Sequence, residues 1–405
     1  MWFWRKKPVI DEQKIREFLT RGVAAVYPSA EFLEKELKSG RRLSMYLGID
    51  PTGPTLHLGH LIPLRKLQLF QELGHEAILL IGDFTGMIGD PTDKTAARRR
   101  LSRREVLENA RLYKEQASKF LSFGGENPAR LKYNSVWNGK LSFEGVLDLA
   151  SHVTVDQMLK RDMFENRMKE GKPIYLHEFL YPMIQGYDSV AMGVSGELGG
   201  NDQTFNMLVG RTLVKQVQNR EKFVMATKLL ADSSGKKMGK TEGNMITFLD
   251  SPEEMVGKIM SISDELIVPA FELSTGVALS EIRRIEEELK SGGNPRDAKL
   301  RLAETIVTEL YGGNAAGRAV EAFVQTFSRG EIPAHIPTVS PAAGTPLSEI
   351  LVPDYVASKS ELRRLIDAGA IERMGGERVT RIDEAIEEAA VFRIGKKKFV
   401  KVNIQ

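Results

Sequence analysis

The first feature of the chain is an alternation of short apolar runs with breaker-rich and helix-periodic segments. Residues 43–49 form an apolar run that ends in the breaker-rich segment 50–54. Leucines at helical spacing then cover residues 61–70, and a second apolar run occupies residues 77–81. This alternation predicts parallel strands joined by crossover helices in an open α/β sheet. Because ligands bind at the carboxyl ends of such strands, residues 48–60 are a candidate site.

The remaining segments are mainly helical in their spacing. Amphipathic patterns cover residues 107–123 and 146–163, and apolar stripes recur through residues 252–327. Residues 331–346 contain several prolines and no helical period, which predicts a linker. A compact module of residues 347–405 then completes the chain.

Composition narrows the class of protein only a little. The chain has 405 residues, 42% of them hydrophobic and 27% charged, which is the balance of a globular protein with two or three domains. No apolar run approaches the roughly 20 residues that a membrane-spanning helix needs. The absence of cysteine excludes disulfides and thiolate chemistry and agrees with a reducing cytosol. The six scattered histidines predict no metal site, and a net charge of +3 permits a polyanionic partner without demanding one.

A pair of histidines marks the first candidate site. His57 and His60 stand three residues apart where a helix is expected to begin, after the loop that follows the first predicted strand. Both imidazoles can face a phosphate there, and Gly59 leaves room for a nucleotide to approach closely. Histidines at such positions also serve as helix caps and packing residues, so the pair alone does not decide between the two roles.

A run of lysines marks the second candidate site. Lys236, Lys237 and Lys240 lie among small and flexible residues, followed by Thr241. Lysines in such a loop can move onto a triphosphate, where their point charges offset the negative charge that develops on pyrophosphate. Taken alone, a lysine run in a loop is more often a solvated surface.

A third polar segment, residues 199–203, follows a short apolar run. Its asparagine, aspartate and glutamine would lie at the end of another strand. Glycine, asparagine and aspartate are also common turn formers, so a simple turn is the alternative reading.

Three polar side chains share one face of an otherwise apolar helix. Tyr181, Gln185 and Asp188 are at positions i, i+4 and i+7, which places them on the same side. Buried polar groups without partners cost about 1–3 kcal/mol each. This face therefore predicts a polar ligand or a network of polar partners.

These segments together resemble the signature of the class I aminoacyl-tRNA synthetases. His57-Leu58-Gly59-His60 stands where that family has His-Ile-Gly-His, and Lys237-Met238-Gly239-Lys240-Thr241 stands where it has Lys-Met-Ser-Lys-Ser. The resemblance implies a Rossmann-like α/β catalytic domain that activates an amino acid with ATP and transfers it to tRNA. It also implies that Mg²⁺ arrives with ATP and has few ligands from the protein.

Within that class, the chain resembles the bacterial tyrosyl-tRNA synthetases over nearly its whole length. The pocket of that family has a tyrosine on the first strand and a Tyr-x-x-x-Gln-x-x-Asp helix, which correspond to Tyr46 and residues 181–188. The resemblance implies L-tyrosine as substrate, with Tyr46 and Asp188 bonded to its phenol hydroxyl. It further implies that the tyrosine ammonium group is held by Tyr181, Gln185 and Asp90, and that Gln203 lies where the α-phosphate meets the carboxylate. For ATP it implies Gly48, Asp50, Gly59, Asp202, Lys94 and Arg98, and for the departing pyrophosphate Thr52, His57, His60, Lys237, Lys240 and Thr241.

The resemblance also implies how the chain is divided and what it binds. It implies a catalytic domain over residues 1–248, an α-helical anticodon-binding domain over 249–330, a linker over 331–346 and a small α+β S4-like RNA-binding domain over 347–405. It implies tRNA(Tyr) as partner, a cytoplasmic setting, and a homodimer formed through an insertion near residues 120–175. RNA phosphates would meet Arg363, Arg364, Lys396, Lys397 and Lys398. The sequence departs from the S4 pattern at its hairpin, where Gly375-Gly376 replaces the usual Asn-Gly and the preceding segment is one residue longer.

Other functions remain possible from the sequence alone. A tryptophanyl-tRNA synthetase shares the fold and both phosphate motifs, although Tyr46 and Asp188 form a hydroxyl-reading pair of little use to an indole. A synthetase relative that only binds RNA, and a nucleotidyltransferase that adenylates a small acid without tRNA, are the two further alternatives. The intact phosphate motifs argue against the former, and the two candidate RNA-binding regions argue against the latter.

Overall fold

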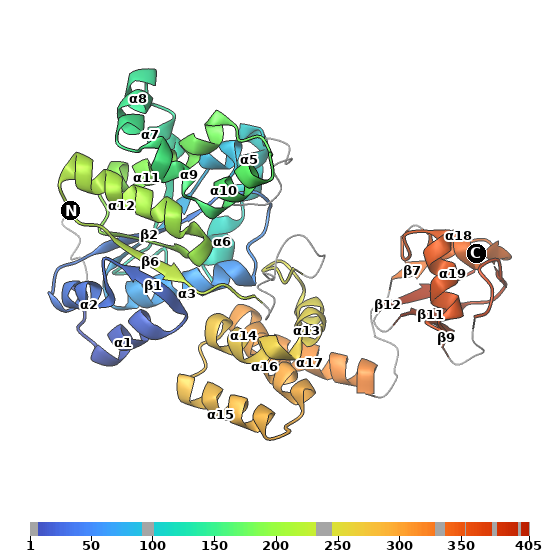
Figure 1. Cartoon of the computed structure of the whole chain (residues 1–405). Helices are drawn as coiled ribbons and strands as arrows, with labels where there is room; N and C mark the ends of the chain where they lie inside the picture. The colour runs from blue at the N-terminus through green and yellow to red at the C-terminus, as the bar shows by residue number, and fades with distance from the viewer. Residues whose placement is uncertain are drawn as a thin grey trace. The chain divides into compact units, whose positions relative to one another are not determined.

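The computed structural model divides the chain into two units, Met1–Gly317 and Arg318–Gln405 (Figure 1). The boundary between the two units falls inside one helix, α17 (Gly313–Ser328). The residues that the structure describes are 7–90, 101–231, 245–328, 337–352, 354–374, 379–395 and 398–404.

A six-stranded sheet forms the centre of the first unit. Its strands are β1 (Val23–Tyr27), β2 (Ser44–Ile49), β3 (Glu76–Ile81), β4 (Arg130–Tyr133), β5 (Gly196–Gly200) and β6 (Phe223–Thr227). They lie in the order β1-β6-β5-β2-β3-β4, and all neighbours run parallel except β1, which is antiparallel to β6. The strand order reverses between β2 and β5, where ligands bind in Rossmann-like sheets. The predicted α/β sheet is confirmed, with the two apolar runs forming β2 and β3.

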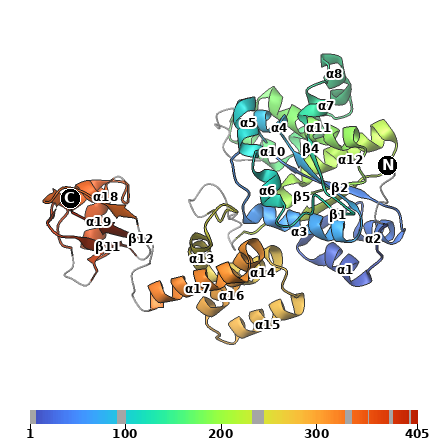
Figure 2. The ribbon, with the colours of Figure 1, turned by 180° about the vertical axis from the view of Figure 1, so that it is seen from behind.

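Helices cover both faces of this sheet. Figures 1 and 2 show α3 on one side and the pair α11 and α12 on the other. The apolar stripe of α3 is fully buried at Leu61, Leu64 and Leu67, and burial of each such side chain contributes about 2 kcal/mol. The helices of this α/β part are α1 (Glu12–Thr20), α2 (Ala30–Lys38), α3 (Leu58–Glu72), α4 (Thr85–Ile88), α5 (Arg103–Ala110), α6 (Tyr113–Ala117), α7 (Ser135–Asn138), α8 (Phe143–Ser151), α9 (Val155–Leu159), α10 (Asp162–Lys169), α11 (Leu176–Met192) and α12 (Thr204–Gln218), with the 3-10 turn η1 (Asn201–Gln203).

The long amphipathic helices expected over residues 107–123 and 146–163 are each divided in the structure. Helices α5 and α6 share the first range, and α8, α9 and α10 share the second. Thr154 shows the reason, because its side chain accepts a hydrogen bond from the Gln157 amide and so caps a new helix within the periodic pattern. Apolar spacing alone did not reveal this interior cap.

A helical part follows the sheet within the same unit, as the periodicity predicted. Arg21, just after α1, joins this part to the sheet layer by donating to the carbonyl groups at the C-terminal end of α14. Its guanidinium reaches the oxygens of Glu272 at 2.9 Å and Thr275 at 2.6 Å. The helices here are α13 (Pro252–Met260), α14 (Ile267–Ser274), α15 (Leu279–Lys290), α16 (Pro295–Tyr311) and α17, with the 3-10 turn η2 (Asp264–Leu266).

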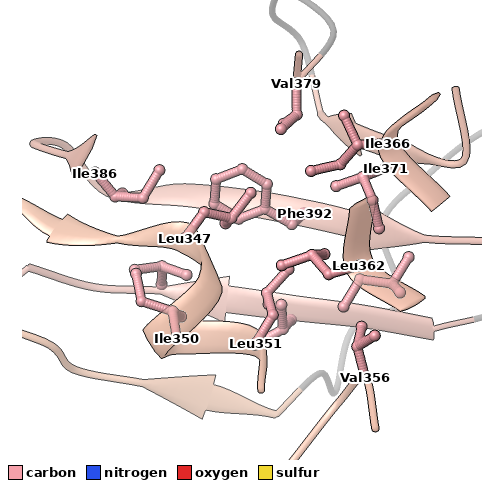
Figure 3. Packing of buried hydrophobic residues seen from close by; sticks show 13 residues of the cluster. Leu347, Ile350, Leu351, Val356, Leu362, Ile366, Ile371, Val379, Ile386 and Phe392 are labelled. Carbon is pink, nitrogen blue, oxygen red and sulfur yellow. The ribbon is translucent and has the colours of Figure 1, made fainter. Parts of the chain in front are cut away.

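The C-terminal unit has its own hydrophobic core, which Figure 3 shows from close by. Leu347 and Leu351 from one helix, Leu362 from another and Phe392 from the sheet are fully buried in it. Four strands lie in the order β7-β12-β11-β9, and β8 pairs with β10. The elements are β7 (Thr338–Val339), β8 (Thr345–Pro346), α18 (Leu347–Leu351), α19 (Lys359–Asp367), β9 (Ile371–Arg373), β10 (Ala385–Ile386), β11 (Ala390–Ile394) and β12 (Lys398–Val402).

The expected linker is shorter than the sequence suggested. Residues 331–346 were expected to connect two domains, but β7 pairs in parallel with β12 and β8 pairs with β10. Two-residue strands carry no periodic signal, so the prolines dominated the sequence pattern. Residues 329–336 and the glycine pair of the expected hairpin, Gly375-Gly376, lie outside the described residues.

Candidate active site

Polar residues follow the carboxyl ends of four adjacent parallel strands. Asp50 follows β2, Asp83 comes shortly after β3, Asn134 follows β4, and η1 with Asp202 and Gln203 follows β5. These strands surround the reversal of strand order. The candidate site predicted from residues 48–60 therefore lies where an open α/β sheet binds its ligands.

Asp188 forms the first part of the site, on α11. Its carboxylate is buried and accepts hydrogen bonds from Asn134 Nδ2 at 3.2 Å, Trp137 Nε1 at 2.7 Å and Asn138 Nδ2 at 2.9 Å. Burial raises the pKa of Asp188 to about 7, and the three donors oppose that rise. A carboxyl group with this pKa changes its charge near neutral pH.

Tyr46 lies beside Asp188, on β2. Its side chain is 1% exposed, and its hydroxyl lies 3.0 Å from Ser189 Oγ. Burial raises the pKa of Tyr46 well above its ordinary value, and the negative charges of Glu197 and Asp188 raise it further. The phenol therefore keeps its proton. The structure brings together Tyr46 and Asp188, the two residues that the resemblance assigned to one hydroxyl group.

Tyr181, about two α-helical turns before Asp188 on α11, bonds to the residue that follows β2. Its hydroxyl donates to Asp50 Oδ2 at 2.9 Å, and Thr85 donates to Asp50 Oδ1 at 2.6 Å. Gly82 makes this approach possible, because a Cβ there would lie 2.5 Å from Thr85 Oγ1 and closer still to Asp50. Asp50, expected at ATP, and Tyr181, expected at the ammonium group, are thus directly connected.

Asp90 and Gln203 form a second connected pair. Gln203 Nε2 donates to Asp90 Oδ2 at 2.6 Å, and Arg161 approaches the other carboxylate oxygen at 3.4 Å. The charge of Asp90 also raises the pKa of Tyr181, after the larger effects of burial and of Asp50. Asp90, Tyr181 and Gln203, all predicted for the amino acid, therefore lie near one another.

Gln185, the middle residue of the predicted polar face, turns toward β5. Its Nε2 donates to Glu197 Oε1 at 3.1 Å. Glu197 is itself paired with the buried Lys222. The polar helix face of the sequence analysis therefore meets a network of partners in the structure.

The two histidines cap α3 in this structure. Gly59 donates its amide proton to His57 Nδ1 at 3.1 Å, and the His57 amide donates to His60 Nδ1 at 3.2 Å. When Nδ1 accepts, a neutral imidazole carries its proton on Nε2, which makes that nitrogen a donor. Capping and phosphate binding are therefore compatible roles for this pair.

The loop before the histidines is held by side chains of α5 and α6. Asn109 donates to the Pro51 carbonyl at 2.9 Å, Tyr113 to Gly53 at 2.7 Å and Gln116 to Pro54 at 3.1 Å. Thr52 lies in this loop, with its amide bonded to the Asp50 carbonyl at 2.8 Å. Three donors from one side of a helical segment thus fix the backbone that carries Thr52.

Gly48 is exposed in β2, and Asp202 is half-buried in η1.

Several predicted residues lie outside the described residues. These are Lys94 and Arg98, in the segment 91–100, and Lys237, Lys240 and Thr241, in the segment 232–244. The chain just after the lysine segment is described. Leu58 donates to the Ile246 carbonyl at 3.1 Å, and Phe248 to that of Leu56 at 2.9 Å. The chain that follows the lysine segment is therefore paired with the chain around His57. In the described parts of the chain, no cluster of three or more His, Asp or Glu side chains is arranged to hold a metal ion.

Comparison with known proteins identifies the family. The family described as tRNA synthetases class I (W and Y) matches residues 38–328. The chain belongs to this family. A tyrosine–tRNA ligase of Moorella thermoacetica is 44% identical to this synthetase over 411 residues, which cover 99% of this chain and 98% of the relative. Another, from Shewanella oneidensis, is 44% identical over 97% of this chain and 99% of its own length.

Solved structures agree with the assignment of the fold. A C-terminally truncated mitochondrial tyrosyl-tRNA synthetase of Aspergillus nidulans matches with a TM-score of 0.67 and 25% identity, covering 78% of this chain and 94% of its own. A tyrosyl-tRNA synthetase of Archaeoglobus fulgidus, solved with L-tyrosine, matches with a TM-score of 0.58 at 22% identity, which concerns the fold alone.

The C-terminal unit of this synthetase presents the two predicted arginines. Arg363 and Arg364 are exposed on α19, whose apolar face is buried at Leu362 and Ile366. Lys396 and Lys397 lie outside the described residues, and the side chain of Lys398, at the start of β12, is not described. No helix in the described part of the chain has the length and apolar character needed to cross a bilayer.

Sequence reasoning missed most of the residues that support the site. Asn134, Trp137 and Asn138 hold Asp188, while Glu197 and Lys222 meet Gln185 and one another. One signal was present, since Asn134 directly follows a strand end where ligand-binding side chains gather. A glutamate within the apolar run of β5 was a second signal, because a buried carboxylate needs a partner.

Proposed function

We propose that this chain acts as a tyrosine–tRNA ligase in cytoplasmic translation. It activates L-tyrosine with ATP to give tyrosyl-adenylate and pyrophosphate, and then transfers the tyrosyl group to the 3′ end of tRNA(Tyr). The observation that carries the proposal is the burial of both Tyr46 and Asp188 in a class I synthetase fold, where burial and then the charges of Glu197 and Asp188 raise the pKa of Tyr46. The names of its relatives support the same reaction.

Tyr46 and Asp188 recognise the phenol hydroxyl in this proposal. An ionised Asp188 accepts a hydrogen bond from the phenol hydroxyl, and the Tyr46 hydroxyl donates a hydrogen bond to the phenol oxygen. Phenylalanine lacks the hydroxyl and so removes one hydrogen bond from each of these buried groups, about 1.5–3 kcal/mol for the bond to the charged carboxylate and about 0.5–1.5 kcal/mol for the neutral one. An indole N–H can donate to Asp188 but cannot accept a hydrogen bond. Tyr46 is therefore the residue that favours tyrosine over tryptophan.

The ammonium group of tyrosine lies between Asp90, Tyr181 and Gln185 in this proposal. Asp90 supplies negative charge, and the other two supply oxygen acceptors. The hydrogen bond from Tyr181 to Asp50 leaves the Tyr181 oxygen with lone pairs for a cation. Gln203, bonded to Asp90, lies beside the carboxylate that reacts.

Activation needs no nucleophilic side chain. The carboxylate of tyrosine attacks the α-phosphate of ATP, the bond to the bridging oxygen breaks, and pyrophosphate leaves with the electron pair. The protein contributes positioning and charge stabilisation. His57 and His60 donate from Nε2 to the phosphates, Thr52 lines the loop, and Gly48, Asp50, Gly59 and Asp202 lie along ATP. The family resemblance assigns further residues to the pyrophosphate, where they offset its charge together with the Mg²⁺ bound to ATP. These residues are Lys94, Arg98, Lys237, Lys240 and Thr241.

We assign tRNA binding to the parts that follow the catalytic domain. The proposed boundaries are 1–248 for the catalytic domain, 249–330 for anticodon binding and 347–405 for the S4-like domain. The exposed Arg363 and Arg364 support RNA binding, because guanidinium groups bind phosphates in bidentate geometry. Lys396, Lys397 and Lys398 would add to this basic surface.

We also infer a homodimer through residues near 120–175. Val136, Phe143 and Leu147 on α7 and α8 are 56%, 79% and 55% exposed, which is unusual for large apolar side chains so close in sequence. Figures 1 and 2 show these helices at the outer end of the first unit. A second copy would cover them. Light scattering should show a dimer that Phe143→Glu converts to a monomer, while Val217→Glu, at another exposed valine, leaves the mass unchanged.

Amino-acid-dependent ATP–pyrophosphate exchange tests the reaction. We expect exchange with tyrosine and not with tryptophan or phenylalanine, and an increase of about 100-fold in the KM for tyrosine in Asp188→Asn. Glu31→Gln, at an exposed carboxylate, is the matched control and should behave as wild type. Exchange with tryptophan would replace the proposed substrate. No exchange with any amino acid would leave an RNA-binding relative of the synthetases.

A further inference from the structure

A buried ion pair lies behind the candidate tyrosine pocket. Lys222 is 0% exposed and Glu197 is 2% exposed, and their side chains are in direct contact. Lys222 also donates to Ser189 Oγ at 2.7 Å, and that hydroxyl lies 3.0 Å from the hydroxyl of Tyr46. Because Glu197 is directly opposite Tyr46 across β5 and β2, the pair belongs to the wall of the pocket.

Two glycines make room for this pair where α11 crosses α12. A Cβ on Gly210 would lie 2.8 Å from Lys222 Nζ and 3.3 Å from Glu197 Oε2, and a Cβ on Gly186 would lie 3.0 Å from Gly210 Cα. The two helices thus approach closely enough to close over the charges. Replacing a buried ion pair with apolar side chains is often neutral or favourable for stability. Stability alone therefore gives little reason for this arrangement.

Gln185 is the side chain that the pair orients. Gln185 Nε2 donates to Glu197 Oε1 at 3.1 Å, while Gln185 Oε1 is buried and accepts no hydrogen bond among the described residues. An amide rotated by 180° would place Oε1 against the carboxylate, where two acceptors repel each other. The Glu197 carboxylate therefore selects one of two otherwise similar orientations.

We propose that Glu197 and Lys222 are positioning residues that keep the Gln185 carbonyl oxygen directed at the ammonium group of tyrosine. The inference rests on the proposed function, in which Gln185 accepts from that ammonium group. Lys222 balances the charge of Glu197, and Glu197 holds the Gln185 amide by its nitrogen. In the opposite orientation the amide would present two donors to a cation, which repels them.

A pair of ligands separates this role from general support of the fold. L-Tyrosine has the ammonium group, whereas 3-(4-hydroxyphenyl)propionate has the same phenol and carboxylate without it. In Glu197→Gln, the new amide can donate to Gln185 Oε1 and so permit the wrong orientation. Calorimetry on the full chain should show a Kd for tyrosine at least about tenfold higher, with the Kd for the propionate within about twofold of wild type.

Two further variants keep the test decisive. Glu197→Gln leaves Lys222 buried without a counter-charge, so the double variant Glu197→Gln/Lys222→Met removes both charges and should show the same selective loss. Glu221→Gln is the matched control, because it removes a carboxylate of a partly exposed ion pair just before β6, and should change neither Kd.

Three results would overturn the inference. Equal weakening of both ligands in the folded double variant would mean that the pair only supports the pocket wall. Unchanged affinity for tyrosine would mean that the pair does not orient Gln185. Failure of the wild-type chain to bind tyrosine would overturn the proposed substrate as well, and so is distinguishable from the first two results.

Discussion

Replacing Trp137 with phenylalanine should shift the pH dependence of tyrosine activation. The indole of Trp137 donates the shortest of the three hydrogen bonds that Asp188 accepts, at 2.7 Å. That bond favours the ionised carboxylate and opposes the burial that raises the pKa of Asp188 to about 7. Phenylalanine keeps an aromatic ring of similar shape but has no N–H. The pKa of Asp188 should therefore rise further in Trp137→Phe.

The size of the shift follows from the energy of the lost bond. A hydrogen bond to a charged group contributes about 1.5–3 kcal/mol, and one pKa unit corresponds to about 1.4 kcal/mol, so the pKa should rise by at least about one unit. From a pKa of about 7, the ionised fraction of Asp188 at pH 7.5 would fall from about three-quarters to about one quarter. With the same one-unit rise, Asp188 at pH 9 would be almost fully ionised in the wild type and about nine-tenths ionised in the variant.

The assay is kcat/KM for tyrosine in ATP–pyrophosphate exchange between pH 6 and 9, because this parameter reports pKa values of the free enzyme. The ratio of variant to wild type cancels the titration of tyrosine itself. If only the ionised Asp188 accepts the hydrogen bond from the phenol, the ratio should be about one-third at pH 7.5 and should rise toward one at pH 9. The KM for ATP should not change with the same profile.

Two outcomes would refute this reasoning. A ratio that stays constant with pH would mean that Trp137 contributes packing without affecting the charge of Asp188. A ratio near one at pH 6 that rises several-fold above one toward pH 9 would mean that the protonated carboxyl is the active form. In that case, Asp188 would donate to the phenol oxygen, and its raised pKa would serve that purpose.

Two other substitutions test how the site is built and held. Gly82→Ala should push Asp50 from its place and lower kcat for exchange at least about tenfold. Gly257→Ala is the control and should keep wild-type activity, because a Cβ there would have no neighbour within 4 Å. Equal kcat values for the two variants would contradict the proposed crowding at Gly82. Arg21→Met should lower the free energy of unfolding in urea by about 3 kcal/mol, because several carbonyl groups at the end of α14 lose a buried charged donor. Lys228→Met, at a half-exposed ion pair, should change it by less than about 1 kcal/mol, and a similar loss in both variants would remove the special role of Arg21.

The sequence predicted the strands and helices that carry the site better than the residues that hold its side chains in place. Strand and helix spacing located β2, α3 and β3, and the positions i, i+4 and i+7 correctly placed Tyr181, Gln185 and Asp188 on one face of α11. Those patterns are local, and local periodicity is what a sequence displays directly. The interior cap at Thr154 was missed, because a single threonine interrupts a helix without disturbing its apolar spacing.

The partners of the polar face could not be predicted in the same way. Trp137 bonds to a carboxylate 51 residues away along the chain, and Lys222 contacts a glutamate 25 residues away. These separations have no periodicity, since they depend on how β4, β5 and β6 are ordered across the sheet. The sequence predicted only that a buried charge must have a partner, and it did not predict which residue that partner is.

Different partners give the two buried carboxylates of the pocket different roles. Asp188 is held by three neutral N–H groups, which leave it close to a change of charge near neutral pH. Glu197 instead contacts the ammonium group of Lys222, a full positive charge that balances its own. Asp188 is therefore suited to contact the neutral hydroxyl of the substrate directly. Glu197 is suited to orient Gln185, which meets the charged end. Substitutions at Asp188 should accordingly alter discrimination against phenylalanine, whereas substitutions at Glu197 should alter discrimination against ligands without an ammonium group.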